Sequence, residues 1–164
     1  MSMAKKTARR PTAFVTGASQ GIGAAVALAL ARDGFDVAVS STRPEKLSGV
    51  LDTITAAGAR ALPVELELRS QDSIERAMAS VVAEFGALDV LVNNAGLALR
   101  KSALEMTLDE WNDIIGVDLT GTFFMCQQMG RHLIGTKREG CIINMASTHG
   151  MVAMANRSAY GIAK

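Results

Sequence analysis

The 164-residue sequence contains only two cysteines, Cys126 and Cys141, and only two histidines, His132 and His149. The cysteines lack the spacing of a zinc site and are too few for a disulfide framework. The histidines lie too far apart in the sequence to indicate a metal centre. We therefore expect free thiols and no resident metal, the usual state of a cytoplasmic protein.

Three further absences restrict the class of protein. No run of about 18 uncharged apolar residues exists, so we expect no membrane-spanning helix. The basic start "MSMAKKTARR" runs into Pro11 without an apolar stretch, so we expect no secretory signal. With 17 basic and 16 acidic residues, the net charge of +1 predicts no broadly basic surface for nucleic acid. We interpret residues 1–10 as a basic, solvated tail, in preference to a contact with nucleic acid or a membrane.

The remaining sequence, residues 11–164, alternates apolar strand-like runs with helix-like segments. The predicted strands are residues 12–17, 36–40, 61–66, 88–96 and 141–147. The predicted helices are residues 21–34, 43–58, 72–86, 107–135 and one that begins near 156 or 157. The strands are nearly continuous apolar runs, which is typical of parallel strands covered on both faces. We predict an α/β fold, a doubly wound parallel sheet of the Rossmann type in a single domain.

A glycine-rich loop follows the first predicted strand and precedes the first predicted helix. It reads Thr16-Gly-Ala-Ser-Gln-Gly-Ile-Gly23. Gly17 suits a tight turn, Gly21 lets the backbone approach a pyrophosphate, and Gly23 lets the helix pack close to the strand. The positive end of the helix would then face the phosphates. The loop favours dinucleotide binding over a purely structural turn.

Four motifs together closely resemble the short-chain dehydrogenase/reductase family. They are the Gly-x-x-x-Gly-x-Gly loop, "NNAG" at residues 93–96, Ser147, and Tyr160-x-x-x-Lys164. Ser147 lies thirteen residues before Tyr160, as in that family. The resemblance runs from about Thr12 to Lys164, and it is strongest to bacterial members grouped with 3-oxoacyl-[acyl-carrier-protein] reductases. It implies hydride transfer between NADP(H) and a carbonyl or secondary alcohol.

The resemblance assigns the chemistry to three residues. Tyr160 is the expected acid/base, Ser147 hydrogen-bonds the substrate oxygen, and Lys164 holds the nicotinamide ribose. A free tyrosine has a pKa of about 10, and a nearby ammonium favours the phenolate. Residues four apart share one helix face, so Lys164 is expected to lower the pKa of Tyr160.

One position departs from the family pattern. The family places an asparagine in the long helix where this sequence has Asp118, in "VDLTG". If the role is played by the backbone carbonyl, which holds a water against the lysine, an aspartate can replace the asparagine. If the side-chain amide must donate, an ionised aspartate cannot. Both alternatives stay open, and Asp118 is kept among the catalytic candidates.

The resemblance also implies the residues that bind the cofactor. They are Gly17, Ser19, Gln20, Gly21, Ile22, Gly23, Ser41, Thr42, Arg43, Glu67, Leu68, Asn94, Ala95, Gly96, Tyr160 and Lys164. The second strand ends without an acid, since Asp36 lies at its other end, and its hydroxyls and Arg43 favour NADP. NAD stays possible because NADP-preferring relatives often carry an arginine where this loop has Gln20. Asn93 is assigned either a structural role or a cofactor contact.

Several expectations concern the protein beyond these motifs. The sequence ends within the predicted catalytic helix, so we expect a Rossmann domain incomplete at its C-terminus and part of a longer protein. The family implies a homotetramer or homodimer. Residues 147–160 are expected to line part of the substrate cleft, with His149, Met151 and Met154 assigned either ligand contact or loop packing. The competing hypothesis is a non-catalytic dinucleotide-binding sensor or regulatory protein.

Overall fold

A computed structural model describes residues 9–164, and its centre is a five-stranded parallel sheet. The strands are β1 (Thr12–Val15), β2 (Asp36–Ser41), β3 (Ala61–Glu65), β4 (Val90–Asn93) and β5 (Cys141–Asn144). Their order across the sheet is β3-β2-β1-β4-β5. This order confirms the predicted doubly wound sheet, in which the chain reverses its direction of growth between β1 and β4. Most of the predicted basic tail, residues 1–8, lies outside the described residues.

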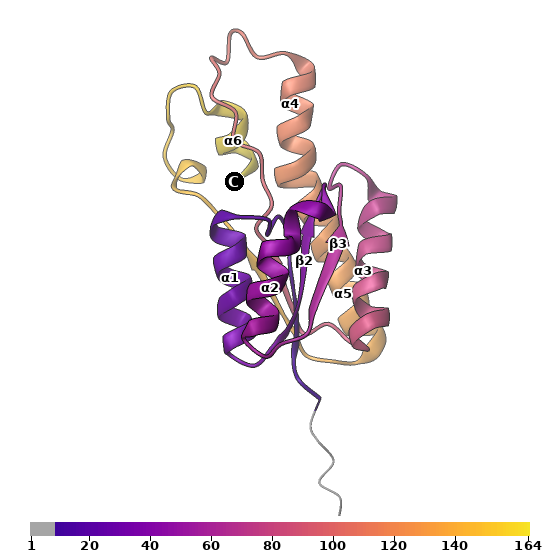
Figure 1. Ribbon diagram of the computed structural model, residues 1–164. Coiled ribbons are helices and arrows are strands. Elements are labelled where there is room, and N and C mark those ends of the chain that lie inside the picture. Colours follow the sequence, from indigo (N-terminus) through magenta and orange to yellow (C-terminus); the bar gives the residue numbers. More distant parts are fainter. Residues whose placement is uncertain (1–8) are drawn as a thin grey trace, which may run out of the picture.

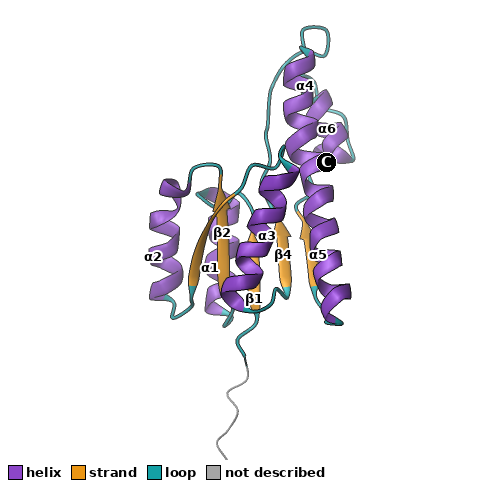
Figure 2. Ribbon diagram, turned by 90° about the vertical axis from the view of Figure 1, so that its right-hand side faces the viewer, coloured by secondary structure: helices purple, strands orange, loops and turns teal. Residues whose placement is uncertain are grey.

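Helices cover both faces of the sheet. All helical segments of the described residues are α1 (Gly21–Arg32), η1 (Pro44–Leu47), α2 (Ser48–Ala56), α3 (Gln71–Phe85), α4 (Leu108–Ile114), η2 (Ile115–Gly121), α5 (Thr122–Thr136), η3 (Thr148–Gly150) and α6 (Ser158–Ala163). Helices α1 and α2 lie on one face, and α3 and α5 lie on the other (Figure 1). Helices α4 and α6 stand beyond the carboxyl edge of the sheet (Figure 2).

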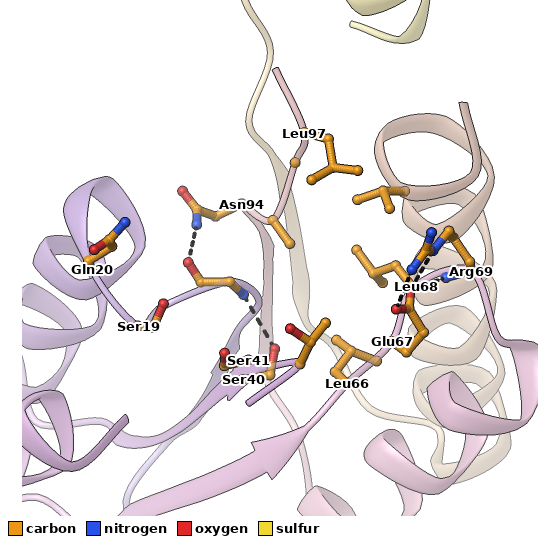
Figure 3. A pocket seen from close by; sticks show the side chains of 15 residues that line it. Ser19, Gln20, Ser40, Ser41, Leu66, Glu67, Leu68, Arg69, Asn94 and Leu97 are labelled. Carbon is orange, nitrogen blue, oxygen red and sulfur yellow. Dashed lines mark hydrogen bonds and ion pairs between the residues drawn. The ribbon is translucent and has the colours of Figure 1, made fainter. Parts of the chain in front are cut away.

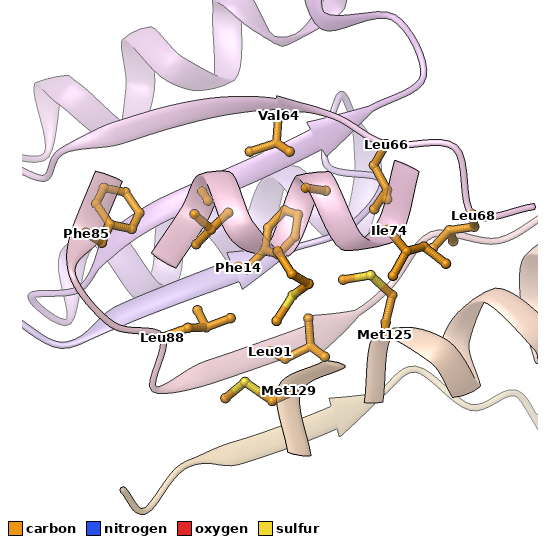
Figure 4. Close-up of a cluster of buried hydrophobic side chains, with 14 of the residues drawn as sticks. Phe14, Val64, Leu66, Leu68, Ile74, Phe85, Leu88, Leu91, Met125 and Met129 are labelled. Carbon is orange, nitrogen blue, oxygen red and sulfur yellow. The ribbon is translucent and has the colours of Figure 1, made fainter. Parts of the chain in front are cut away.

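Consecutive strand residues point to opposite faces, so β1 contributes to two cores. Phe14 packs with Leu91 and Met125 between the sheet and helices α3 and α5 (Figure 4). Its neighbour Val15 packs with Ile54 and the residues of α1 and α2 on the other face. All five side chains are almost fully buried, and each such burial contributes about 2 kcal/mol. The two cores explain why the strand sequences are apolar on both sides.

β1, β4 and β5 are shorter than predicted because their carboxyl ends leave the sheet early, whereas β2 ends one residue later than predicted, at Ser41. β1 ends at Val15, β4 at Asn93 and β5 at Asn144, each two or more residues before the predicted end. The residues that follow form loops at the carboxyl edge. The predicted helix over residues 43–58 also differs, since it enters as the short 3₁₀ turn η1 and α2 ends at Ala56. Apart from β2, each correction moves residues out of regular structure and into loops.

The predicted helix over residues 107–135 is continuous but not uniform. Its capping box is confirmed, because the Glu110 N–H donates to Thr107 Oγ1 (3.2 Å) and the Thr107 N–H donates to the Glu110 carboxylate (2.8 Å). The unexpected feature is the π-helical segment η2 between α4 and α5. A Cβ atom added to Gly116 would lie 3.1 Å from Arg69 Cγ, and one added to Gly121 would lie 2.6 Å from the Leu68 carbonyl oxygen. Hydrogen bonds from i to i+5 place these two glycines against one segment, the chain after β3.

Candidate functional site

A cleft of about 500 Å³ opens at the carboxyl edge of the sheet, where the loops after β1, β2, β3 and β4 meet (Figure 3). This is the edge at which ligands bind in open parallel sheets. Ten residues of the predicted cofactor set line it. They are Gly17, Ser19, Gln20, Ser41, Thr42, Glu67, Leu68, Asn94, Ala95 and Gly96. Residues from four separate loops thus meet in one elongated cleft.

A smaller cavity of about 170 Å³ adjoins the cleft. The two share Asn94, Gly96 and Leu97 among their lining residues. Ile22, Tyr160 and Lys164 line the smaller cavity, together with residues that follow β5. The predicted acid/base and its lysine therefore line a cavity that shares residues of the "NNAG" segment with the cleft.

The glycine loop has the conformation that its sequence predicts. Gly17 and Gly21 both adopt positive φ, +63° and +62°. A Cβ on Gly23 would lie 2.5 Å from Asn94 Nδ2 and 2.7 Å from the Gly17 carbonyl oxygen. No neighbouring atom lies within 4 Å of a Cβ on Gly21, so this glycine faces open space. The tight turn at Gly17 and the close packing at Gly23 are confirmed, and the open side at Gly21 leaves room for a ligand.

A hydrogen-bond network that no sequence motif predicted joins this loop to the loop after β4. Thr16 Oγ1 accepts hydrogen bonds from the N–H groups of Asn94 and Ala95, both at 3.0 Å. Asn94 Nδ2 donates to the carbonyl oxygens of Thr16 (2.9 Å) and Gly17 (3.0 Å). The Asn94 side chain therefore holds the loop in place. Asn93 is buried and donates to Asn144 Oδ1 (2.8 Å), which favours its structural assignment.

The end of β2 carries hydroxyl groups and no acid. Ser40 Oγ accepts from the Gly17 N–H (3.3 Å), and Ser41 Oγ accepts from the Arg43 N–H (3.1 Å). The Arg43 side chain is exposed next to the cleft and forms no ion pair with any residue in the range 9–164. Asp36 lies at the opposite end of β2, where it pairs with Arg10 at 3.3 Å. Arg43 is thus an exposed cation that directly follows the lining residue Thr42 and has no ion-pair partner among the described residues.

Glu67 is held by Arg69, a lining residue that the sequence analysis missed. Arg69 donates from Nε to Glu67 Oε1 (3.0 Å) and from Nη2 to Oε2 (2.9 Å) (Figure 3). It also pairs with Asp113. The hydrogen bonds from Arg69 outweigh the effect of burial and lower the pKa of Glu67. The two carboxylates raise the pKa of Arg69 further. In the sequence, this ion pair was indicated only by the spacing of Glu67 and Arg69, two residues apart after β3.

Tyr160 lies among three polar side chains. Its ring centroid is 5.8 Å from Lys164 Nζ and 5.7 Å from Arg157 Cζ, and the His149 ring packs edge-on at 5.9 Å. Ser147 caps η3, because its Oγ accepts from the His149 N–H at 3.2 Å. His149 therefore touches both Ser147 and Tyr160. Met151 and Met154 are exposed.

The Asp118 side chain contacts two segments of the candidate site. Its side chain is fully buried in η2, and Oδ1 accepts from the Leu97 N–H at 2.6 Å. Oδ2 lies 3.3 Å from Lys164 Nζ. The carboxylate therefore ties the loop after β4 to α6 and gives Lys164 a counter-ion. The two predicted alternatives concern other contacts, a backbone carbonyl that holds a water or a donated hydrogen bond, and both stay predictions.

Residues 9–164 contain neither a membrane-spanning helix nor a candidate metal site. No helix in this range is long and apolar enough to cross a bilayer. Within the same range, His, Cys, Asp and Glu side chains do not form a group of three or more that could hold a metal ion. Cys126 and Cys141 are both free thiols.

Comparison with known sequences agrees with the motifs. The profile of the short chain dehydrogenase family matches residues 11–164. A 3-oxoacyl-[acyl-carrier-protein] reductase FabG of Staphylococcus aureus is 37% identical over 150 residues, which cover 91% of this chain and 61% of that protein. A 2-dehydro-3-deoxy-D-gluconate 5-dehydrogenase of Escherichia coli is 40% identical over 136 residues, covering 82% and 53%. The chain thus spans about 61% of the length of the first of these curated relatives.

Solved structures show the same fold. A metagenomic short-chain oxidoreductase in complex with NADP superposes with a TM-score of 0.88 and 37% identity, over 94% of this chain and 70% of that one. A short-chain type dehydrogenase/reductase from Mycobacterium marinum gives a TM-score of 0.91 and 33% identity, over 94% and 63%.

Proposed function

Because this chain belongs to the short-chain dehydrogenase/reductase family, we propose that it forms the nucleotide-binding and catalytic part of an NADP(H)-dependent oxidoreductase. The substrate is a small molecule that carries a carbonyl group or a secondary alcohol. One observation carries the proposal: the cleft over the glycine loop and the cavity lined by Tyr160 and Lys164 share Asn94, Gly96 and Leu97 as lining residues.

The cleft fits a dinucleotide. The positive φ of Gly17 and Gly21 turns the loop so that the amino end of α1 faces the cleft, where N–H groups attract phosphate. The open side of Gly21 admits a pyrophosphate at close range. Apolar Leu66, Leu68 and Val117 line the far end, which suits an adenine ring. We assign Glu67, Asn94, Ala95 and Gly96 to the same surface.

NADP is preferred over NAD because of the residues that follow β2. Ser41 and Thr42 line the cleft, and the exposed Arg43 beside them has no acidic partner within residues 9–164. A 2′-phosphate requires such donors and cations, whereas a 2′-hydroxyl is usually read by a carboxylate. A relative of the same fold binds NADP, which supports the assignment.

A bound nicotinamide supplies or accepts the hydride, and the residues of this chain handle the proton. In carbonyl reduction, the carbonyl carbon gains the hydride and the substrate oxygen gains the phenolic proton of Tyr160. The Ser147 hydroxyl donates a hydrogen bond to the same oxygen. Lys164 stabilises the phenolate that results, and it also holds the ribose. In alcohol oxidation the same steps run in reverse.

The names of the relatives support a substrate class for the proposed enzyme. The matched proteins are named for a 3-oxoacyl thioester and for a sugar acid, two substrates that share a carbonyl or secondary alcohol. We therefore restrict the proposal to that functional group. We also propose a cytoplasmic homodimer or homotetramer, as the family resemblance implies.

The test is a comparison of the wild-type protein with Tyr160→Phe. Oxidation of NADPH and NADH is followed by absorbance with a panel of ketones, and reduction of NADP with secondary alcohols. We expect wild-type turnover with at least one substrate, loss of turnover in Tyr160→Phe by about a thousandfold or more, and unchanged NADPH binding. Nucleotide binding without turnover in the wild-type protein would favour the sensor hypothesis instead.

A further inference from the structure

Asp118 and Lys164 form a buried ion pair behind Tyr160. The Asp118 side chain is fully shielded from solvent and that of Lys164 is 10% exposed. Asp118 Oδ2 lies 3.3 Å from the ammonium nitrogen and has no hydrogen-bond partner. Solvent therefore screens this pair far less than the surface ion pairs of the molecule.

The negative charge is not needed to hold the backbone. The Leu97 N–H donates to Asp118 Oδ1 at 2.6 Å, and the carbonyl oxygen of a neutral asparagine could accept the same bond. What an asparagine lacks is the charge on the second oxygen, which faces Lys164. Burial of a carboxylate costs free energy unless a group of opposite charge pairs with it. The negative charge of Asp118 therefore pairs with the Lys164 ammonium.

We propose that Asp118 is the fixed counter-ion of Lys164: it holds the ammonium beside the Tyr160 phenol and offsets part of the positive charge that the phenol meets there. Asp118 is thus a positioning residue, which acts on Tyr160 only through Lys164. Its effect on turnover rests on the proposed function, whereas its effect on ionisation of the phenol does not.

The other charged groups around Tyr160 leave Asp118 as the deciding carboxylate among residues 9–164. Helix α6 contributes Arg157 and Lys164, and η3 contributes His149. In η2, Asp118 is the sole charged residue.

Helix α4 packs against α6 through Ile114 and Trp111, which meet Ala159 and Ala163. Its acidic residues are engaged elsewhere or exposed. Glu110 pairs with Lys101, Asp113 pairs with Arg69, and Asp109 faces solvent.

The experiment measures ionisation of the phenol without any substrate. Tyr160 is the only tyrosine of the sequence, so the ultraviolet absorbance of phenolate reports it directly, with Tyr160→Phe as the blank. We expect Asp118→Asn to move the titration midpoint to lower pH by about one unit, because the ammonium then acts without compensation. Asp36→Asn is the matched control, since Asp36 is also buried and ion-paired but lies at the other end of the sheet.

A second pair of variants separates charge from shape. Lys164→Met leaves the carboxylate unpaired and should move the midpoint to higher pH. Asp118→Asn combined with Lys164→Met removes both charges and should return it close to the wild-type value. If Asp118→Asn fails to fold, judged by circular dichroism, the comparison of Lys164→Met with the double variant tests the same charge. The proposal is overturned if Asp118→Asn titrates like wild type and Asp36→Asn, or if the double variant titrates like Lys164→Met.

The two proposals can fail separately. Midpoints in the expected order, in a protein that turns over no carbonyl or alcohol, would support the counter-ion and contradict the proposed function. Turnover that depends on Tyr160, with a midpoint that does not respond to position 118, would support the function and overturn the counter-ion.

Discussion

A Cβ atom on Gly17 would lie 2.7 Å from the Cα of Ala95, so these two loops approach this closely only because position 17 has no side chain. The contact joins the loop after β1 to the loop after β4. It also fixes one wall of the cleft, because both residues line it.

Gly17→Ala should therefore damage both stability and nucleotide binding. The new methyl group meets backbone atoms that cannot turn away, and φ of +63° is strained for any residue with a Cβ. We expect a loss of about 2 kcal/mol or more in the free energy of unfolding, together with at least a tenfold weaker Kd for NADPH. Urea denaturation and calorimetric titration measure the two effects.

Gly58→Ala is the control for this substitution. Gly58 has a similarly positive φ of +81°, but no atom lies within 4 Å of its would-be Cβ. It should lose only about 1 kcal/mol and keep its nucleotide affinity. Equal losses in the two variants would contradict a specific contact between Gly17 and Ala95.

The Thr16 hydroxyl supports the loop after β4, which makes Thr16→Val a second test. Two N–H groups, those of Asn94 and Ala95, lose their acceptor in a buried place, at a cost of about 1–3 kcal/mol. Thr16→Ser keeps the hydroxyl and should stay within about 1 kcal/mol of wild type. Hydrogen exchange at the two amides should accelerate in the valine variant alone, and unchanged exchange there would refute the role of the hydroxyl.

The features that were predictable from sequence are those carried by local patterns. Gly17, Gly21 and Gly23 occur between an apolar strand and a helix, so their turn and close packing followed from spacing. Tyr160 and Lys164 share a helix face for the same reason. The parallel, doubly wound sheet likewise follows from the alternation of apolar runs with helical segments.

The features that were missed depend on contacts between distant segments. Asp118 reaches Lys164 across 46 positions of sequence, and Thr16 reaches Asn94 across 78. The π-helical segment also escaped prediction, because it depends on how Gly116 fits the chain after β3. No local propensity encodes such distances, and only the assembled sheet brings these residues together.

Arg43→Ala should change the choice between cofactors. Arg43 is exposed and free of ion pairs among residues 9–164, so its removal costs little stability. A lost charge-assisted contact with the 2′-phosphate is worth about 1.5–3 kcal/mol, so we expect the Kd for NADPH to rise about tenfold or more. The Kd for NADH should not change.

The matched control is Arg32→Ala, an exposed arginine in the last turn of α1. It should leave both dissociation constants as in wild type. Equal weakening of NADPH and NADH binding in Arg43→Ala would show that Arg43 does not distinguish the two nucleotides.

The hydrogen bonds of the Asp89 carboxylate should make the stability of the protein depend on pH. Burial alone would raise the pKa of its carboxyl, but hydrogen bonds from Arg9, Thr12 and Arg138 outweigh this and lower it to about 2. The pKa of this carboxyl is lower in the folded state than in the unfolded state, where it is about 4. The ionised carboxylate therefore contributes its full stabilisation of the native state at pH values above about 4. The contribution is then lost as the pH falls from about 4 towards 2.

Asp89→Asn removes this dependence and is the sharpest test of the Asp89 contacts. At neutral pH it should destabilise the protein by about 1 kcal/mol, a figure reduced for solvent screening because the two arginines are partly exposed. The difference from wild type should shrink as the pH falls from 4 to about 2, since the wild-type carboxyl becomes neutral there. Urea titrations at several pH values measure it. A difference that stays constant down to pH 2 would show that Asp89 acts through shape and not through its charge.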